Sequence, residues 1–97
     1  MQEKNKNVDV KVRFLGGLED GLPIKDHSIT VTIKEPLTTY HLLDTLIEDY
    51  PLLRSRLKNQ GELAPDLMIV VNGVVTREDI PLQQGDEVLL MYIGVGG

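Results

Sequence analysis

The chain has 97 residues, enough for one domain with one core, and we expect that domain to span residues 1–97. Its net charge of −5 argues against an electrostatic grip on nucleic acid, and the lack of cysteine excludes disulfides, thiolate metal sites and a cysteine nucleophile. No apolar run is long enough to cross a membrane and the N-terminal MQEKNKN lacks the apolar stretch of a secretory signal, so we expect a cytoplasmic protein.

The first two predicted elements are β-strands. Apolar and polar residues alternate over residues 8–14 and again over residues 29–33, a period of two that is typical of strands with one buried face. Between them, residues 16–27 contain glycines, a proline and an Asp-Gly pair, which predict a loop. Two consecutive strands joined by a modest loop most simply form an antiparallel pair.

A helix is predicted next. It is expected to begin at Thr38 or Thr39, whose hydroxyl can cap it, and to end before Pro51. Residues 52–58 are expected to add a further turn or two, before a loop that contains a glycine and a proline. Apolar side chains recur at helical spacing and form one stripe on the helix: Leu42, Leu43, Leu46, Ile47 and Tyr50.

The remaining residues predict three more strands. An apolar run over residues 67–71 is followed by Asn72-Gly73 and by Val74-Val75. Asn-Gly between two apolar runs favours a two-residue hairpin, because both positions of a type I′ turn require positive φ. A turn over residues 84–86 then precedes the last strand, residues 87–93.

This order of elements predicts a β-grasp, or ubiquitin-like, fold of the α+β class. We expect a mixed sheet of four to five strands with one main helix packed on one face. The helix stripe is expected to pack against Val10, Val12, Val31 and the last strand. Each such side chain contributes roughly 1.5–3 kcal/mol when it is fully buried.

The last strand and the strand over residues 67–71 are apolar on both faces. With a helix on only one face, the other face would show an apolar patch, and such patches mark partner surfaces. The alternative is that these strands are central and are shielded by neighbouring side chains. The candidate partner-binding residues are Ile69, Leu89, Met91 and Ile93.

The last four residues are the candidate reactive segment. Gly94 and Val95 precede the final Gly96-Gly97, and we expect residues 94–97 to form a flexible tail. Glycine has no Cβ, so a diglycine can enter a channel too narrow for other residues and present its carboxylate to an enzyme. The alternative is simple fraying, because small residues are common at chain ends.

Other chemistry has little support in the sequence. His27 and His41 are too few for an all-histidine zinc site, and both are expected to be ordinary surface residues. The acidic residues of the helix and the basic cluster of Arg54, Arg56 and Lys58 are best explained as solvated helix faces. We therefore predict no catalytic side chain and no metal site.

The chain resembles the ubiquitin-like sulfur carriers of the MoaD/ThiS family, in particular the small subunit of molybdopterin synthase. The matching stretches are VKVRFLGGL, TTYHLLDTLIEDYPLLRSRL, IVVNG and PLQQGDEVLLMYIGVGG, in this order. The family often has prolines where this chain has Met91-Tyr92, and a glycine near Leu37. We expect the missing prolines to loosen the tail and alter its fit to a particular partner.

The resemblance implies that the C-terminus is the reactive group. An E1-like adenylating enzyme of the MoeB/ThiF kind would use ATP to join the Gly97 carboxylate to AMP, and a sulfur donor would convert it to a thiocarboxylate. A larger, MoaE-like synthase subunit would then receive the sulfur for the molybdenum cofactor. The chain would bind no cofactor itself and would be a co-substrate rather than an enzyme.

Three alternatives remain open at this point. The chain could be a protein modifier joined through Gly97 to lysines of target proteins. It could carry sulfur for another pathway, such as thiamine, tRNA thiolation or cysteine. It could also be an interaction module whose tail is inert, because fold alone does not decide function.

Overall fold

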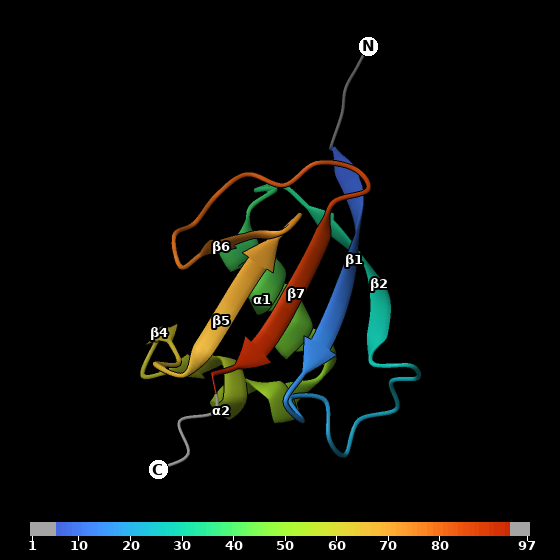
Figure 1. Ribbon diagram of the computed structural model, residues 1–97. Coiled ribbons are helices and arrows are strands. Elements are labelled where there is room, and N and C mark those ends of the chain that lie inside the picture. Colours follow the sequence, from blue (N-terminus) through green and yellow to red (C-terminus); the bar gives the residue numbers. More distant parts are fainter. Residues whose placement is uncertain (1–5, 94–97) are drawn as a thin grey trace.

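The computed structural model describes residues 6–93, which form a sheet with helices against one face (Figure 1). The elements are β1 Asn7–Leu15, β2 Ser28–Lys34, α1 Thr39–Asp49, η1 Pro51–Leu53, α2 Arg54–Leu57, β3 Lys58–Asn59, β4 Glu62–Leu63, β5 Leu67–Val71, β6 Val74–Thr76 and β7 Glu87–Tyr92. The main sheet has five strands in the order β2-β1-β7-β5-β6, and β3 and β4 pair separately.

The sheet is mixed, with β7 at its centre. β7 runs parallel to β1 and antiparallel to β5, and β1 pairs antiparallel with β2 as predicted. β5 and β6 form the predicted hairpin, in which Asn72 and Gly73 have φ angles of 49° and 87°. The α+β class and the β-grasp layout with one main helix on one face are confirmed.

Helix α1 begins and ends where the sequence predicts. The Thr38 hydroxyl accepts a hydrogen bond from the His41 N–H at 3.3 Å and so caps the first turn. The helix ends at Asp49, directly before Tyr50 and Pro51. No helix within residues 6–93 has the length and apolar character needed to cross a bilayer.

The core lies between α1 and the sheet. Leu42, Leu43 and Leu46 are at most 1% exposed, so the predicted helix stripe is buried, although Tyr50 at its end is only half-buried. The face of the sheet that meets them supplies further side chains with no exposed surface: Val10, Val12, Phe14, Ile33, Ile69 and Leu90.

The segment after α1 holds more structure than the sequence predicts. The expected extra turns are present as η1 and α2. The expected loop that follows contains a small hairpin, β3 and β4, joined by Gln60 and Gly61 with φ angles of 55° and 84°. Two-residue strands give too short a pattern to be seen in a sequence, and Gln is not a residue that signals a type I′ turn.

Candidate functional site: the end of β7 and the open face of the sheet

The candidate reactive group, the Gly97 carboxylate, and its tail of Gly94, Val95 and Gly96 lie outside the described residues. The structure does show where the chain enters this tail.

The last described residues are bonded to neighbouring elements. β7 ends at Tyr92, which lies opposite Leu67 of β5. The next residue, Ile93, donates its backbone N–H to the carbonyl of Asp66 at 2.8 Å. We call Tyr92 and Ile93 the tail root.

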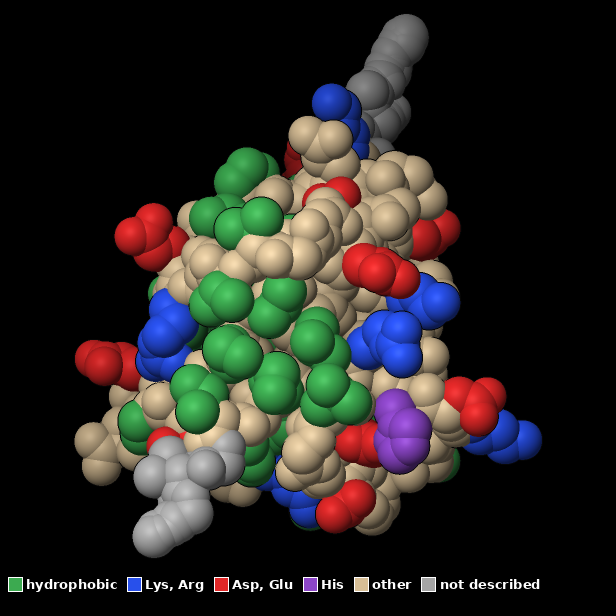
Figure 2. Space-filling model, viewed as in Figure 1, with side chains coloured by type: hydrophobic (Ala, Val, Ile, Leu, Met, Phe, Trp, Pro, Cys, Tyr) green, Lys and Arg blue, Asp and Glu red, His purple; other side chains and the backbone are tan. Residues whose placement is uncertain are grey.

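The face of the sheet opposite α1 is apolar at its centre. Buried and half-buried residues alternate along β5 and over residues 88–91 of β7, so one side of each strand faces α1 and the other faces away. Met68 lies directly opposite Met91 in the β5–β7 pair. We call this surface, which is green in the centre of Figure 2, the open apolar face: Leu15, Met68, Val70, Val75, Leu89 and Met91.

Three of the four candidate partner-binding residues are accessible. Leu89 and Met91 lie on the open apolar face, and Ile93, just beyond β7, is 48% exposed. The placement of Ile69 was wrong. Ile69 lies opposite Leu90, so its side chain faces α1, and it has no exposed surface. The accessible residues of β5 are Met68 and Val70 instead, since side chains alternate between the two faces of a strand.

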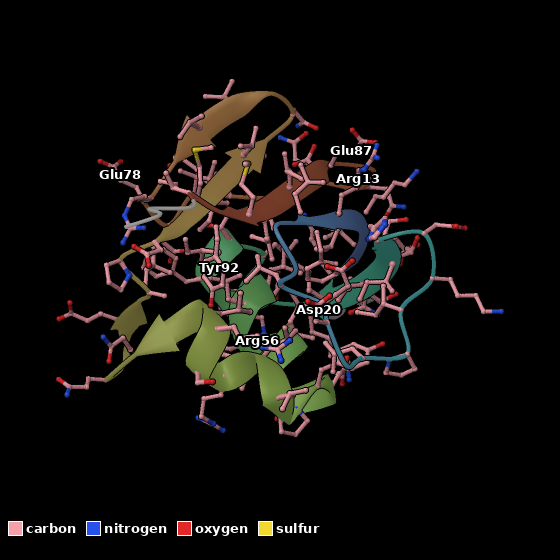
Figure 3. The ribbon with its side chains drawn as sticks, turned by 60° about the horizontal axis from the view of Figure 1, so that its bottom comes forward. Arg13, Asp20, Arg56, Glu78, Glu87 and Tyr92 are labelled. Atoms are coloured by element: carbon pink, nitrogen blue, oxygen red, sulfur yellow. The ribbon has the colours of Figure 1, made fainter. Side chains whose placement is uncertain are left out.

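A hollow of about 240 Å³ indents the open apolar face. Its apolar lining includes Leu15, Val70 and Leu89, and two exposed charged residues, Arg13 and Glu87, lie on its border. Figure 3 shows these two on the neighbouring strands β1 and β7. The hollow can accept an apolar side chain, while Arg13 and Glu87 offer one cation and one anion to polar groups around it.

The sequence predicts that the basic cluster after α1 is a solvated helix face. The structure differs from this prediction for two of the three residues. Arg54 is exposed, but one guanidinium nitrogen of Arg56 donates to the carbonyls of Leu18 and Asp20, at 2.9 and 2.7 Å. Lys58 bonds to the Asp44 carboxylate at 2.6 Å. Two of the three basic side chains therefore hold elements together.

His27 also has a partner that the sequence does not reveal. Its Nδ1 meets the carboxylate of Glu19, which is only 8% exposed although the imidazole is largely in solvent. The hydrogen bond and the charge of Glu19 raise the pKa of His27, helped by Asp26 and Asp20. Burial acts to raise the pKa of Glu19. The hydrogen bond from His27, a backbone hydrogen bond and the charge of His27 outweigh this effect and hold the pKa below its usual value.

The described residues contain no cluster of three or more His, Asp or Glu side chains suited to a metal ion. Of the carboxylates of α1, Asp44 pairs with Lys58, and Glu48 and Asp49 are exposed. The features that stand out for function are therefore the tail root and the open apolar face beside it.

Comparison with known proteins identifies a family whose match covers most of the chain. A sequence model of the ThiS family matches residues 13–97, a stretch that includes both β7 and the final diglycine. Among curated proteins, none matches the chain.

Solved structures share the fold. The chain is similar to the solution structure of small archaeal modifier protein 1 from Methanosarcina acetivorans, with a TM-score of 0.77 and 19% identity over 95% of this chain and 99% of that one. The crystal structure of SAMP1 from Haloferax volcanii gives a TM-score of 0.77 and 24% identity over 92% and 99%. The solution structure of the Haloferax volcanii HVO 2177 protein gives a TM-score of 0.70 and 22% identity, over 100% of this chain and 93% of that one.

Proposed function

The chain belongs to the ThiS family, and from this membership we propose that it is a ubiquitin-like sulfur carrier whose reactive group is the Gly97 carboxylate. The observation that carries the proposal is the extent of the family match, which continues through the diglycine to residue 97. The open apolar face next to the tail root supports it, because a carrier must dock on the enzymes that use its tail.

The proposed chemistry needs no catalytic side chain from this protein. The Gly97 carboxylate attacks the α-phosphate of ATP on an E1-like adenylating partner, forming an acyl adenylate and releasing pyrophosphate. Hydrosulfide, the simplest sulfur donor, then attacks the acyl carbon and AMP leaves, so a C–S bond replaces the C–O bond to AMP. The thiocarboxylate is a strong nucleophile, which lets a chain without cysteine carry sulfur.

We propose molybdopterin synthesis in the cytoplasm as the pathway, with a larger MoaE-like subunit as the sulfur acceptor. The chain would then be the small, non-catalytic subunit of the synthase. Support for this finer assignment comes from the resemblance of the sequence to the small subunit of molybdopterin synthase, from which the chain departs at Met91-Tyr92.

Docking is proposed to use the open apolar face. Leu89, Met91 and Ile93 would contact the partner, with Met68 and Val70 in the place first assigned to Ile69. Methionine suits a surface that meets more than one partner, because its unbranched side chain adapts to different shapes.

A second candidate function is protein modification. The similar solved structures include proteins named as small archaeal modifiers. In that case a lysine amine of a target protein, rather than sulfur, would attack the Gly97 acyl adenylate, and AMP would again leave.

The proposal is tested by removing Gly97. Deleting it moves the terminal carboxylate by one residue, and misplacement of a reacting group by about 1 Å already costs about 100-fold in rate. We expect the deletion variant to lose thiocarboxylate formation by at least this factor when it is incubated with ATP, the adenylating partner and sulfide. Gly96→Ala should also be impaired, because it places a Cβ in the diglycine.

The unfolding transition of the deletion variant serves as the control and should match that of the wild type. Thiocarboxylate formation by the deletion variant at the wild-type rate would contradict the proposal.

A further inference from the structure

The tail root is joined to the rest of the molecule by a set of hydrogen bonds that involves Tyr92 and Arg56. We propose that Tyr92 and Arg56 are positioning residues, which fix the point from which the tail leaves the body and so set where its carboxylate can reach. This inference rests on the proposed function, because it assigns the two residues a role in the activation of the tail.

The first contact is made by the phenol. Tyr92 follows Val88 and Leu90 on the side of β7 that faces the helices, but it extends beyond the core. Its hydroxyl donates to the backbone carbonyl of Arg56 in α2 at 2.9 Å. Burial raises the pKa of the Tyr92 phenol, only partly offset by the charge of Arg56, so the hydroxyl stays protonated and remains a donor.

The second contact holds α2 itself. The Arg56 guanidinium bonds to the Leu18 and Asp20 carbonyls of the loop after β1, and the Leu18 side chain is fully buried. Figure 3 shows Tyr92, Arg56 and Asp20 grouped at the end of the molecule where β7 finishes. One residue of α2 therefore links the tail root to a loop anchored in the core.

The backbone around Tyr92 is also closely packed. A Cβ added at Gly16 would lie 3.4 Å from the Tyr92 backbone nitrogen, so the loop after β1 passes directly against the end of β7. On the other side, Ile93 bonds to Asp66 at 2.8 Å. The tail root is thus held by the chain from both sides.

The position of the root matters because the tail is short. Gly97 is the fifth residue after Tyr92, and a fully extended chain of five residues spans at most about 17 Å. If the last residues of β7 fray, the point at which the tail leaves the body varies from molecule to molecule. A smaller fraction of docked complexes then holds the carboxylate at the reacting centre. A partner that grips the open apolar face would then find the tail in place less often.

The test compares two tyrosines that make the same kind of bond. Tyr92→Phe removes the bond to Arg56, and the control Tyr40→Phe removes the bond from the Tyr40 hydroxyl to the Arg77 carbonyl, 2.7 Å, between α1 and the segment after β6. Both changes delete one hydroxyl from a half-buried phenol and leave the ring in place. Arg56→Lys is a second variant that keeps the charge but not the planar guanidinium.

The first measurement is hydrogen exchange. In Tyr92→Phe, the Ile93 amide should exchange about two- to tenfold faster, the factor that one neutral hydrogen bond represents. The Leu82 amide, which donates to the Leu37 carbonyl at 2.7 Å, serves as the internal reference and should be unchanged. An unchanged exchange rate of the Ile93 amide would contradict the proposal that the Tyr92 hydroxyl anchors the end of β7.

The second measurement is adenylation by the partner enzyme. We expect Tyr92→Phe to lower kcat by a similar factor of about two to ten with less than about a twofold change in KM, because the sheet face still docks normally. Tyr40→Phe should match the wild type, and Arg56→Lys should behave like Tyr92→Phe. Faster Ile93 exchange with unchanged kcat would overturn the positioning role.

The two proposals fail in different ways. If the wild type is not adenylated at all, the sulfur-carrier function and the role in activation fall together. The exchange of the Ile93 amide then still decides whether Tyr92 anchors the end of β7.

Discussion

At the scale of single residues, the pair of Glu19 and His27 is the clearest case of chemistry created by folding. The two residues lie eight positions apart in a loop whose glycines, proline and Asp-Gly pair predict a turn but no pairing of side chains. Asp26 and His27 have φ angles of 57° and 59°, which turn the chain back toward Glu19. One Glu19 oxygen, Oε1, is buried with no hydrogen-bond partner among the described atoms, so the contact with His27 is important for this carboxylate.

This pair predicts a pH dependence of stability. The raised pKa of His27 means that its stabilising contribution is complete below the usual value of 6.5 and is lost as the pH rises through the folded-state pKa. The lowered pKa of Glu19 means that its contribution is present above 4.5 and is lost as the pH falls through the folded-state pKa. Between these limits the pair stabilises the loop most.

The measurement is chemical unfolding at about pH 5.5 and about pH 8.5, on either side of the usual histidine pKa. Relative to the wild type, His27→Gln should lose more stability at the lower pH than at the higher one. Glu19→Gln should show the same difference between the two pH values. In the double variant this difference should be no larger than in either single variant. Equal losses at both pH values would contradict the assignment.

At the scale of elements, the two faces of β7 differ in their surroundings. Val88 and Leu90 complete the core, whereas Leu89 and Met91 lie on the open apolar face. Its central place in the sheet, between β1 and β5, brings apolar residues of three strands together on that face. The chain continues from the same strand toward Gly97, so in the proposed function β7 would couple docking to delivery of the tail.

Met91→Asp tests the open apolar face as a docking surface. A carboxylate placed in an apolar interface lacks a partner, and we expect the affinity for the adenylating enzyme to fall about tenfold or more, as for truncated interface anchors. Titration calorimetry with the folded variant is the measurement.

The control is Val74→Asp, which adds the same charge to a hairpin residue that is 66% exposed and lies opposite Val71, whose side chain faces the helices. Its affinity should stay near that of the wild type. Equal affinities for both variants would show that the partner binds elsewhere.

At the scale of the whole molecule, the fold leaves the choice between carrier and modifier open. The same β-grasp serves proteins named as modifiers, and fold does not imply function. In both roles the body docks and the Gly97 carbonyl is activated. The attacking group decides the outcome, and that group belongs to the partner.

Intact-mass analysis of the protein from its native cell separates the two roles. We expect the free chain to carry a mass increase equal to the replacement of one oxygen by one sulfur, and to co-purify with a larger synthase subunit. Treatment with an alkylating reagent should label this species and leave the Gly97 deletion variant unlabelled, since the chain has no cysteine. Abundant conjugates to lysine with no thiocarboxylate would favour the modifier instead.

The sequence by itself determined the main elements and their order along the chain. Thr38 caps α1, Asn72-Gly73 turns the hairpin, and period-two alternation marks β1 and β2. These signals are local, since each depends on residues within one turn or one strand. The family match, which runs through the diglycine, is likewise a property of the sequence.

Only the tertiary structure decided which apolar residues are accessible and what holds the tail root. β5 is apolar on both faces, so periodicity does not show which face meets α1, and the pairing of Ile69 with Leu90 settled it. The bonds from Tyr92 to Arg56 and from Arg56 to the loop after β1 span 36 to 38 positions in the chain. No local pattern encodes such contacts, because they depend on where the sheet and the helices bring distant residues together.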